Sequence, residues 1–402
     1  MSDLTGQLKQ IAAAMVRERR NEHVELSSQI HANPEIRFQE HQAAQWLCET
    51  LERHGFRVER PVAGLATAFV ARRILGRGGP SVGILAEYDA LEQVGHACGH
   101  NIIATSSVAA AVALKDVAQA QVEGLDGEII VYGTPGEEGG GGKCYMADAG
   151  LFKECDVILQ MHPTGTNGIY DGFDAREALE VTFTGRPAHA AATPEQGLNA
   201  LDGAVIFYQS LALLRKQMRH DLRVFGIFAH GGEHPIIIPA EAKVQLFVVS
   251  QTSKYLFEEA VPAVEDCARG AALASRTQVS VRRYVPTYQD LVRVSALDDA
   301  LAANMAALNR PLEDRGRGQH GSSDMGNVSY LAPSAGIYVK IGRRDLVHHA
   351  PEFTEASISE EGHQGMLDGG AALAMTAVDI MTRPELRAQI RKQWEEQIAV
   401  RR

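Results

Sequence analysis

Two short segments carry side chains whose types and spacing suit metal chemistry. Residues 95–101 hold Cys98 and His100 one residue apart, beside glycines. Further along, Glu137 and Glu138 stand next to each other ahead of four glycines. A thiolate, an imidazole and a carboxylate together bind a borderline-soft divalent ion. A neighbouring second carboxylate can take a proton from metal-activated water. The two segments therefore predict a metal-dependent hydrolase.

For each segment there is also an alternative interpretation, in which the residues have only a structural role. A single cysteine is usually a small buried apolar group, and adjacent glutamates usually lie on a solvated helix surface. Cys98 instead lies among small residues in a loop after a predicted strand. The glutamate pair lies between an apolar strand and glycines, where no surface helix is expected. We therefore expect Cys98 and His100 to bind metal and the two glutamates to divide metal binding and proton transfer. His96 is a candidate for a residue that contacts the metal ligands and does not bind the metal itself.

Three further histidines are candidate ligands. His162 follows the apolar stretch 157–161, where a structural histidine at a strand end is the alternative. His348 and His349 lie in a loop before the last predicted helix. Adjacent histidines do not easily bind the same ion, so we expect at most one of these two to be a ligand.

Asp89 and His189 are two more polar residues whose surroundings in the sequence bear on their roles. Asp89, at the end of a predicted strand, either caps a helix or orients a metal-binding imidazole. His189, in residues 185–191, reads by itself as an ordinary loop histidine.

The elements that must position these residues alternate between strands and helices. This order predicts an α/β fold with a largely parallel sheet, whose ligand sites gather at the loops after the strands. Cys98, Glu137 and His162 each follow a predicted strand. The expected strands are 66–71, 82–86, 128–132, 157–161 and 336–341, and the expected helices are 4–31, 40–54, 102–114, 143–149, 297–308 and 358–381.

A different pattern occupies residues 178–286. Strands are expected at 179–184, 223–229, 244–249 and 278–284, with helices at 198–214 and 255–272. This βαββαβ order predicts a small ferredoxin-like sandwich inserted into the larger domain. We therefore expect a discontinuous metal-binding catalytic domain, residues 1–177 and 287–402, interrupted by a lid at 178–286.

Composition narrows the class of protein. A chain of 402 residues is long enough for two domains. The formal net charge of −11 argues against a nucleic-acid partner. We expect no membrane span, because no apolar run approaches the roughly 20 residues that cross a bilayer. The first twenty residues lack a signal-peptide pattern, and five scattered cysteines suit a reducing compartment. The expected location is the cytoplasm.

The motifs resemble the co-catalytic metallopeptidase family of aminoacylase and carboxypeptidase G. Within it they are most similar to the branch of aminobenzoyl-glutamate hydrolase, hippurate hydrolase, indole-acetyl-amino-acid hydrolases and β-alanyl-lysine-type dipeptidases. The resemblance implies a zinc-peptidase-like three-layer α/β catalytic domain with an inserted ferredoxin-like α/β dimerisation domain. It also implies two divalent ions per subunit, zinc or manganese. The similar stretches are 31–35, 87–91, 95–101, 133–143, 161–163, 185–200 and 349–353.

The same resemblance assigns roles to single residues. Glu137 matches the general base. His189 matches a residue that reaches across a homodimer to the partner's active site and stabilises the developing negative charge. The residues matching metal ligands are Cys98, His100, Glu138, His162 and His349.

Two departures from the family bear on the substrate. Relatives carry a substrate-binding Asn in an Asn-x-x-Pro element, and here that position is Ile236. Relatives also carry an Arg about ten residues later that clamps a substrate carboxylate, whereas residues 247–250 contain no basic side chain. We therefore expect an apolar pocket that suits a planar aromatic better than an ordinary acyl-amino acid or dipeptide. An acidic substrate group would need another partner, for which the candidates are Arg223, His230 and His234.

Three functions remain open on the sequence. The first is an amidohydrolase that cleaves a small N-acyl amino acid, dipeptide or aryl amide, and family base rates favour it. The second is an aminohydrolase that deaminates an aromatic amine of nitroanthranilate type and releases ammonia, and the missing Asn and Arg favour it. The third is a non-catalytic metal-binding protein, which the retention of Glu137 argues against.

Overall fold

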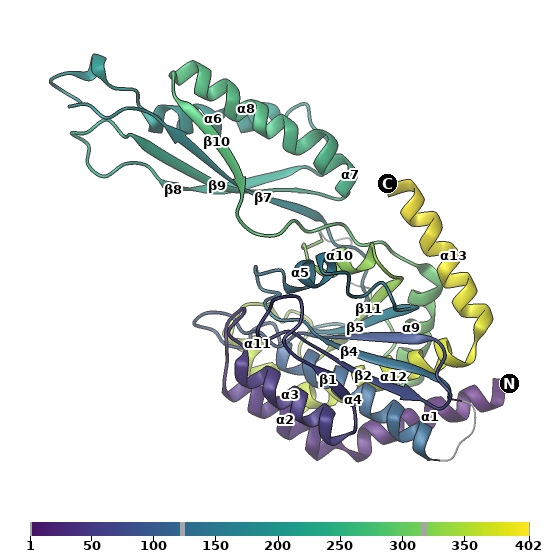
Figure 1. Cartoon of the computed structure of the whole chain (residues 1–402). Helices are drawn as coiled ribbons and strands as arrows, with labels where there is room; N and C mark the ends of the chain where they lie inside the picture. Colours follow the sequence, from purple (N-terminus) through teal and green to yellow (C-terminus); the bar gives the residue numbers. More distant parts are fainter. Residues whose placement is uncertain (1, 121–124, 315–319, 402) are drawn as a thin grey trace. The chain divides into compact units, whose positions relative to one another are not determined.

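The computed structural model describes residues 2–120, 125–314 and 320–401, and the chain divides into two units (Figure 1). The first unit comprises Met1–Gly172, Leu291–Gln319 and Asp324–Val400. The second comprises Phe173–Asp290 and His320–Ser323, with the last two residues of the chain. The second unit thus begins a few residues before the insert expected at 178–286 and ends a few residues after it.

The first unit is built on a seven-stranded sheet with the order β1-β2-β4-β3-β5-β11-β6. The four central strands β4, β3, β5 and β11 run parallel, whereas β1, β2 and β6 pair antiparallel. The sheet is therefore parallel in its centre and mixed at its edges. Its strands are β1 (Arg57–Glu59), β2 (Phe69–Leu75), β3 (Ser81–Ala86), β4 (Gly127–Gly133), β5 (Val157–Thr164), β6 (Gly168–Ile169) and β11 (Ser334–Lys340).

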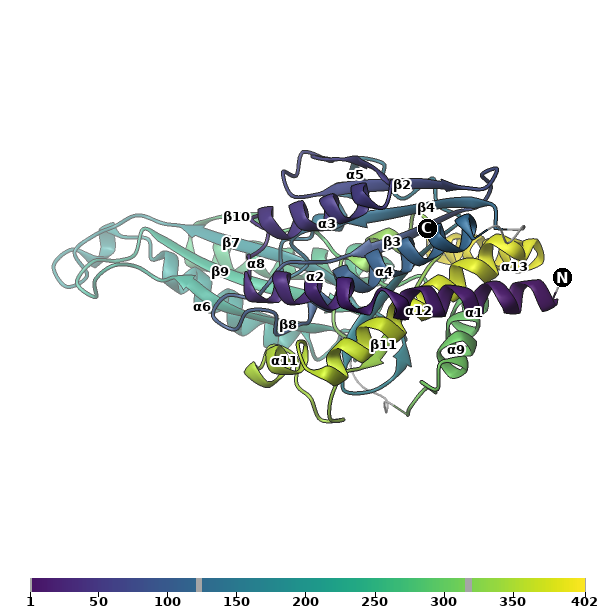
Figure 2. The ribbon, with the colours of Figure 1, turned by 90° about the horizontal axis from the view of Figure 1, so that it is seen from below.

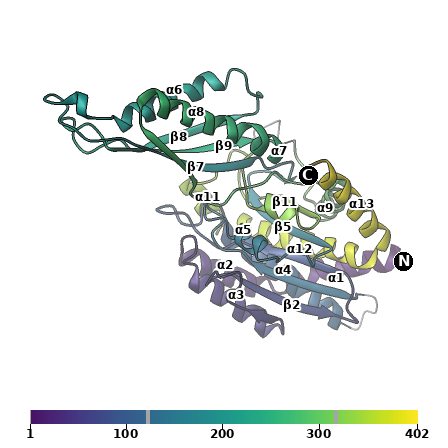
Figure 3. The same ribbon diagram turned by 45° about the horizontal axis from the view of Figure 1, so that its top comes forward.

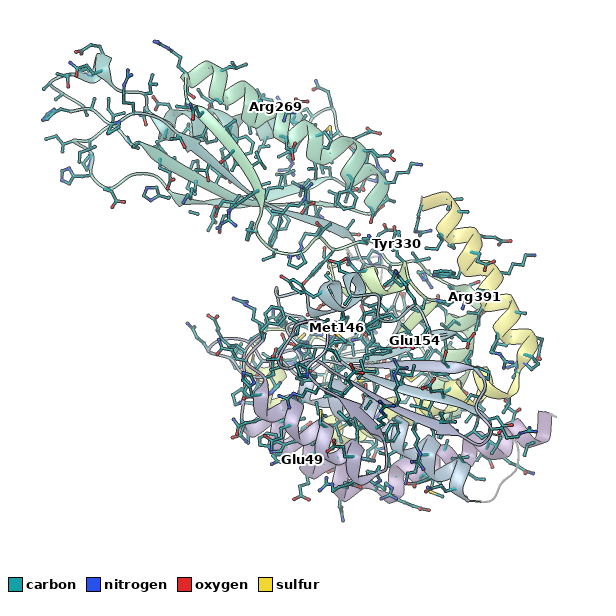
Figure 4. All side chains as sticks on the ribbon, in the orientation of Figure 1. Glu49, Met146, Glu154, Arg269, Tyr330 and Arg391 are labelled. Carbon is teal, nitrogen blue, oxygen red and sulfur yellow. The ribbon has the colours of Figure 1, made fainter. Side chains whose placement is uncertain are left out.

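Helices cover this sheet and complete a three-layer arrangement. Helices α4 and α12 pack against each other and against α1 (Figure 2), while α5 contacts α10. Surface helices are amphipathic: Glu49 of α3 is exposed, whereas Leu47 and Leu51 are buried (Figure 4). The helices are α1 (Ser2–Glu18), α2 (Arg20–Ala32), α3 (His41–Arg53), α4 (His100–Gln119), α5 (Gly142–Asp148), α9 (Ser295–Ala307), α10 (Met325–Ser329), α11 (Pro351–Ala356), α12 (Glu360–Thr382) and α13 (Pro384–Arg401).

Several element boundaries differ from the sequence predictions. The first helix is interrupted at Arg19, whose guanidinium donates through Nε to Asp116 at 2.7 Å. Strand β5 continues to Thr164, so His162 lies within the strand rather than after it. The helix predicted to end the chain is followed by α13, which begins at Pro384, a residue suited to a first helical turn.

Helix α4 corrects the expectation that no segment is apolar and long enough to span a membrane. Its 20 residues meet that test by length and hydropathy. However, 89% of the apolar window is buried inside the structure. The apolar character of α4 therefore reflects its place in the core, between the sheet and the neighbouring helices.

The second unit has a four-stranded antiparallel sheet with the order β10-β7-β9-β8. This is the order of a ferredoxin-like sandwich, as the βαββαβ pattern predicts. Helices α6 and α8 pack on one face of the sheet (Figure 3). The elements are β7 (Ala175–Thr184), α6 (Ala200–Leu214), β8 (Arg223–His230), β9 (Glu241–Ser250), α7 (Ser253–Tyr255), a π-helical turn (Leu256–Ala260), α8 (Val261–Ser275) and β10 (Gln278–Arg283).

Alternation along the strands separates the two faces of this sheet. On β9, Val244, Leu246 and Val248 belong to the apolar core beneath the helices. Residues of the opposite parity, including Phe247 and Val249, therefore lie on the face away from α6 and α8.

Candidate metal centre

The loop between β3 and α4 delivers Cys98 and His100 to the edge of the sheet. Gly99 between them has a positive φ of 73°. A Cβ atom there would lie 2.6 Å from Cγ of Pro163, at the end of β5. Glycine is therefore needed both for the backbone conformation and for close packing against β5. This packing places Cys98 beside the strand that carries His162.

The imidazole of His100 is oriented by Asp89. The ring is fully buried, and Nδ1 donates to Oδ1 of Asp89 at 2.9 Å. The other oxygen of Asp89 accepts the backbone N–H of Glu138 at 2.9 Å. One carboxylate therefore holds an imidazole and the glutamate loop together. In the neutral ring, such a contact fixes the tautomer and leaves Nε2 of His100 with a lone pair.

His162 is held in a similar way from β5. Its Nδ1 donates to the carbonyl oxygen of Pro163 at 2.8 Å, so Nε2 carries the lone pair. That Nε2 atom lies 3.4 Å from Sγ of Cys98. Two atoms that bind soft and borderline metals thus face each other across a short gap.

The turn after β4 brings the two glutamates to the same region. Gly136 has a positive φ of 67°, and its N–H donates to Glu40 at 2.9 Å. Nε2 of His349 lies 3.1 Å from Oε1 of Glu138. His348 instead lies against β5, where its Nε2 is 3.2 Å from the carbonyl oxygen of Pro163. Of the adjacent histidines, His349 is the one beside the glutamate.

The candidate ligands form overlapping groups of three. In each group, one ligand atom per residue lies within 4.8 Å of the others. A shared Cys98 or His100 links the groups, so the atoms form one continuous cluster. The groups are Cys98, His100 and His162; Cys98, Glu138 and His349; and His100, Glu137 and Glu138.

Burial and charge shift the pKa values of these groups in opposite directions. Burial raises the pKa of the Cys98 thiol and lowers the pKa of His162 to about 3. Burial alone would lower the pKa of His100, but the neighbouring Asp89 and Cys98 together outweigh it and raise that pKa well above the ordinary value. Burial alone would raise the pKa of Glu138, but its contacts with His349, His100 and Cys98 together outweigh burial and lower that pKa to about 2.

The pKa of Glu137 shifts in the opposite direction to that of Glu138. Burial, and then the carboxylates of Glu87 and Glu138, raise the pKa of Glu137 well above its ordinary value. Adjacent carboxyl groups with separated pKa values are suited to different tasks. Glu138 stays ionised and can bind a cation, whereas Glu137 can accept and hold a proton.

The donor set fits a divalent metal. Nε2 of His100 is buried and makes no hydrogen bond within the part of the chain that the structure describes. An orphaned buried nitrogen is costly unless a further partner binds it. Thiol, imidazole and carboxylate donors around this atom are the set that zinc and similar ions prefer.

A buried lysine behind the cluster was not predicted from the sequence. Nζ of Lys143 lies 2.6 Å from Glu87 and 2.5 Å from Asp324. Gln160 also donates to Glu87, at 2.5 Å. Glu87 and Asp324, with Glu137, form a fourth group of possible ligands. Glu87 lies two residues before Asp89 in the sequence and could be associated with the site for that reason. No sequence pattern connects the distant Asp324 to the candidate metal centre.

The remaining candidates from the sequence lie apart from the ligand groups or behind them. His96 is buried in the first unit, and neither ring nitrogen has a hydrogen-bond partner among the described residues. Burial lowers the pKa of His96 to about 3, which keeps the ring neutral. The other four candidates belong to the second unit, and none of them joins a ligand group drawn from the described residues: His189, Arg223, His230 and His234.

Two of these residues have local partners. Nδ1 of His189 accepts the N–H groups of Ala191 and Ala192 at 3.3 and 3.0 Å. Nδ1 of His189 is thus used within its own loop. Arg223 forms an ion pair with Asp174.

Comparison with known proteins gives a consistent picture. The family model for peptidase family M20/M25/M40 matches residues 80–369. The Xaa-Arg dipeptidase of Mus musculus is 36% identical over 404 residues, which cover 96% of this chain and 92% of the relative. One of the subunits of the Escherichia coli p-aminobenzoyl-glutamate hydrolase is 33% identical over 285 residues, covering 65% of this chain and 58% of that bacterial chain.

Solved structures show the same fold at lower identity. The aminobenzoyl-glutamate utilization protein of Klebsiella pneumoniae matches 92% of this chain and 98% of its own, with a TM-score of 0.71 and 18% identity. A dinuclear metal-binding M20 peptidase of Bacillus subtilis matches 91% and 99%, with a TM-score of 0.69 and 19% identity. With the family model spanning most of the chain and a dipeptidase matching it nearly end to end, this protein belongs to peptidase family M20/M25/M40 and hydrolyses C–N bonds in small molecules.

Proposed function

We propose that this protein is a dinuclear metal-dependent amidohydrolase that cleaves the C–N bond of a small N-acyl amino acid or dipeptide. The observation that carries the proposal is the cluster of thiol, imidazole and carboxylate groups with Glu137 at its side. A binding site alone would have no use for a second carboxyl group that favours its protonated form.

The ions, zinc or manganese, would be held by Cys98, His100, Glu138, His162 and His349. When bound, such ions supply Lewis acidity that polarises the substrate carbonyl and lowers the pKa of water. Asp89 orients His100 and holds the backbone of Glu138, so it keeps two ligands in register. The Pro163 carbonyl does the same for His162.

Glu137 is the proposed general base. Its raised pKa favours uptake of a proton from the attacking water at its carboxylate oxygens. The same carboxyl group then returns the proton to the leaving nitrogen. His189 is the proposed stabiliser of the developing negative charge, supplied by a second subunit.

The substrate class follows from the named relatives. The mouse relative is named as a dipeptidase, and the bacterial one as an aminobenzoyl-glutamate hydrolase. Both names describe cleavage of an amide between an acyl group and an amino acid. We therefore place acyl-amino acids and dipeptides first among substrates to be tested.

An aromatic aminohydrolase is the second candidate. It is favoured by the apolar residue Ile236, which is 47% exposed. Such a side chain suits a planar ring. The two candidates differ in their products, because deamination releases ammonia and leaves one organic product.

The proposed assembly is a homodimer formed through the second unit. Strand β8 is an edge strand, and an unpaired edge with apolar side chains is a template for pairing with another chain. Large exposed apolar residues gather on β8 and on the adjacent α6. They are Phe225, Ile227 and Phe228 of β8 with Tyr208 and Leu213 of α6.

The proposed location is the cytoplasm. All five cysteines of the chain are free, which suits a reducing compartment. A thiol ligand at Cys98 would also be protected from oxidation there.

The test is a substrate screen on metal-loaded and metal-stripped protein. Acyl-amino acids, dipeptides and aminobenzoates are assayed for organic products and for ammonia. We expect two organic products from an amide, and loss of turnover in excess chelator with recovery on adding zinc or manganese. Full activity of the stripped protein would contradict the proposal, and ammonia with one organic product would select the second candidate.

A further inference from the structure

Glu40, which immediately precedes α3, is a buried carboxyl group with no part in the chemistry proposed above. The residue is 0% exposed. Oε1 accepts the backbone N–H of Phe38 at 2.8 Å and that of Gly136 at 2.9 Å, and Oε2 accepts the hydroxyl of Thr67 at 3.0 Å. These donors offset the cost of burying the carboxyl group. Gly136 begins the glutamate loop, residues 136–140, which carries the proposed general base and a candidate metal ligand.

The ring of Phe38 lies against the same loop. A Cβ atom added at Gly136 would lie 2.9 Å from Cε1 of this ring, and one at Gly140 would lie 2.7 Å from Cε2. Only glycine at these two positions therefore allows the contact. Phe38 has a positive φ of 63°, which is uncommon for a bulky residue. Because Glu40 accepts the N–H of Phe38, it also stabilises the turn that presents the ring.

Arg37 adds a third contact from this segment. Its Nη1 donates to the carbonyl oxygen of Glu138 at 3.1 Å. Arg37 is exposed, so this bond competes with water and contributes less than the buried ones. Three of the four residues 37–40, which we call the clamp, thus contact the glutamate loop through their side chains.

Asp89 holds the glutamate loop at a second point, because it accepts the N–H of Glu138 at 2.9 Å. The segment before the clamp pairs with the residue after Asp89, since the N–H of Ala90 donates to the carbonyl oxygen of Glu35 at 2.8 Å. The two carboxyl groups that hold the loop therefore belong to paired segments. Glu137 is the residue between the two N–H groups that they hold.

We propose that Glu40 is a positioning residue that sets the place of Glu137 relative to the metal ligands, with Phe38 as its apolar support. This rests on the proposed function and deepens it, because it names a residue outside the ligand cluster on which the general base depends. A shift of about 1 Å in a reacting group can cost about a hundredfold in rate. Without the anchor at Gly136, Glu137 would move while Glu138 stays held from the other side.

The first test separates turnover from substrate binding. We would measure kcat and KM for N-benzoylglycine in wild type, Glu40→Leu and Glu40→Gln, together with the metal content of each protein. Glu40→Leu should lose at least about tenfold in kcat, with KM unchanged within about threefold and the metal retained. In Glu40→Gln, kcat should stay within about threefold of wild type, because the amide oxygen accepts both N–H groups and the NH₂ group donates to Thr67.

A matched control shows whether any loss of buried hydrogen bonds near α3 has the same effect. Glu35 also accepts two backbone N–H groups, but they belong to Gln42 and Ala43 of α3, at 2.9 and 3.0 Å. Glu35→Leu should therefore lower the melting temperature and leave kcat unchanged within about threefold. An equal fall in kcat in both leucine variants, a change in KM alone, or an unchanged kcat in Glu40→Leu would overturn the inference.

A second variant keeps the test decisive if Glu40→Leu does not fold. Phe38→Gly removes the ring that supports the glutamate loop, and glycine adopts the positive φ of this position without strain. Its kcat should also fall at least about tenfold with KM unchanged within about threefold. A wild-type kcat in folded Phe38→Gly would overturn the role of the clamp.

Hydrogen exchange separates this inference from the proposed function. Amide exchange in peptides covering residues 133–143 is followed by mass spectrometry in wild type and both Glu40 variants, without substrate. Exchange should be faster in Glu40→Leu and unchanged in Glu40→Gln. Faster exchange in Glu40→Leu, with no amide hydrolysed by wild type, would reject the proposed function and keep the clamp. Unchanged exchange in Glu40→Leu would overturn the clamp.

Discussion

Two imidazoles of the candidate metal centre, those of His100 and His162, are each anchored through Nδ1, which decides what Nε2 can do. Nδ1 of His100 donates to Asp89, and Nδ1 of His162 donates to Pro163. Both Nε2 atoms are then acceptors in a cluster that also contains Cys98. A backbone carbonyl and one carboxylate therefore decide which nitrogen of each ring faces the cluster.

The thiol should be required for metal binding. We expect Cys98→Ser to lose metal and activity together, because a hydroxyl is a much poorer ligand for a borderline-soft ion. Metal content per subunit after gel filtration is the measurement. Cys267→Ser in the second unit is the control, and it should retain both. A Cys98→Ser protein with its full metal content would refute the assignment.

Substitution of the two adjacent glutamates should give two different phenotypes. Glu137→Gln should keep its metal and lose about 10²–10⁴-fold in kcat, the range typical of general acid–base catalysis. Glu138→Gln should lose metal affinity, since the carboxylate that stays ionised is replaced by a neutral amide. Metal titrations and rates on both variants check this, and metal loss in Glu137→Gln alone would reverse the two roles.

Some residues of the candidate site can be predicted from the sequence, and others cannot. Cys98, His100 and Glu138 are visible because their side-chain types occur in glycine-rich loops after strands. The partners of Lys143 are not visible, since Glu87 and Asp324 come from distant segments and meet only in the fold.

At the scale of elements, periodicity predicted most helices and strands but not their limits. The apolar spacing of residues 4–31 is nearly continuous, so the break at Arg19 has no signal in it. Strand β5 was cut short because His162 and Pro163 are poor strand indicators, yet both residues and Thr164 pair with β11 in register. Pairing with a neighbouring strand there overrides local preference.

Helix α2 carries a histidine that should make stability depend on pH. His23 is 1% exposed, and neither ring nitrogen has a hydrogen-bond partner among the described residues. Burial lowers the pKa of His23 from 6.5 to about 4. Between these values the unfolded chain binds a proton that the folded chain does not. The free energy of unfolding should therefore fall as the pH decreases through this window, by about 3 kcal/mol in total.

Denaturant unfolding of wild type and His23→Leu at pH 7 and pH 4.5 is the measurement. Leucine leaves no buried nitrogen unsatisfied, so His23→Leu should lose less stability on acidification than wild type. The exposed His41, changed to Gln, is the control and should behave as wild type does. An identical pH dependence in His23→Leu and wild type would exclude this role for His23.

At the scale of the whole molecule, the sites of a homodimer should be completed by the second subunit. Mixing inactive His189→Ala with inactive Glu137→Gln should restore part of the activity, because one site of each heterodimer then holds both native residues. Subunit exchange is verified by differently tagged copies. Complete exchange without any recovery would show that His189 does not act across subunits.

The edge strand gives an independent check on the same assembly. Ile227 is 63% exposed on β8, and a lysine there should oppose edge pairing. We expect Ile227→Lys to sediment as a monomer at concentrations where wild type is a dimer. Lysine at the exposed Leu273 of α8 is a matched surface control. An unchanged dimer in Ile227→Lys would place the interface elsewhere.

The paired backbones of Arg176 and Tyr288 have a consequence for the origin of the second unit. Because these residues exchange two hydrogen bonds, the chain enters and leaves the insert side by side. Ends that lie together can be joined by a short connection at little cost in loop entropy. A module of this kind can be gained, lost or replaced without altering the path of the host chain. The second unit can therefore diversify while the loops that carry the candidate metal ligands stay unchanged.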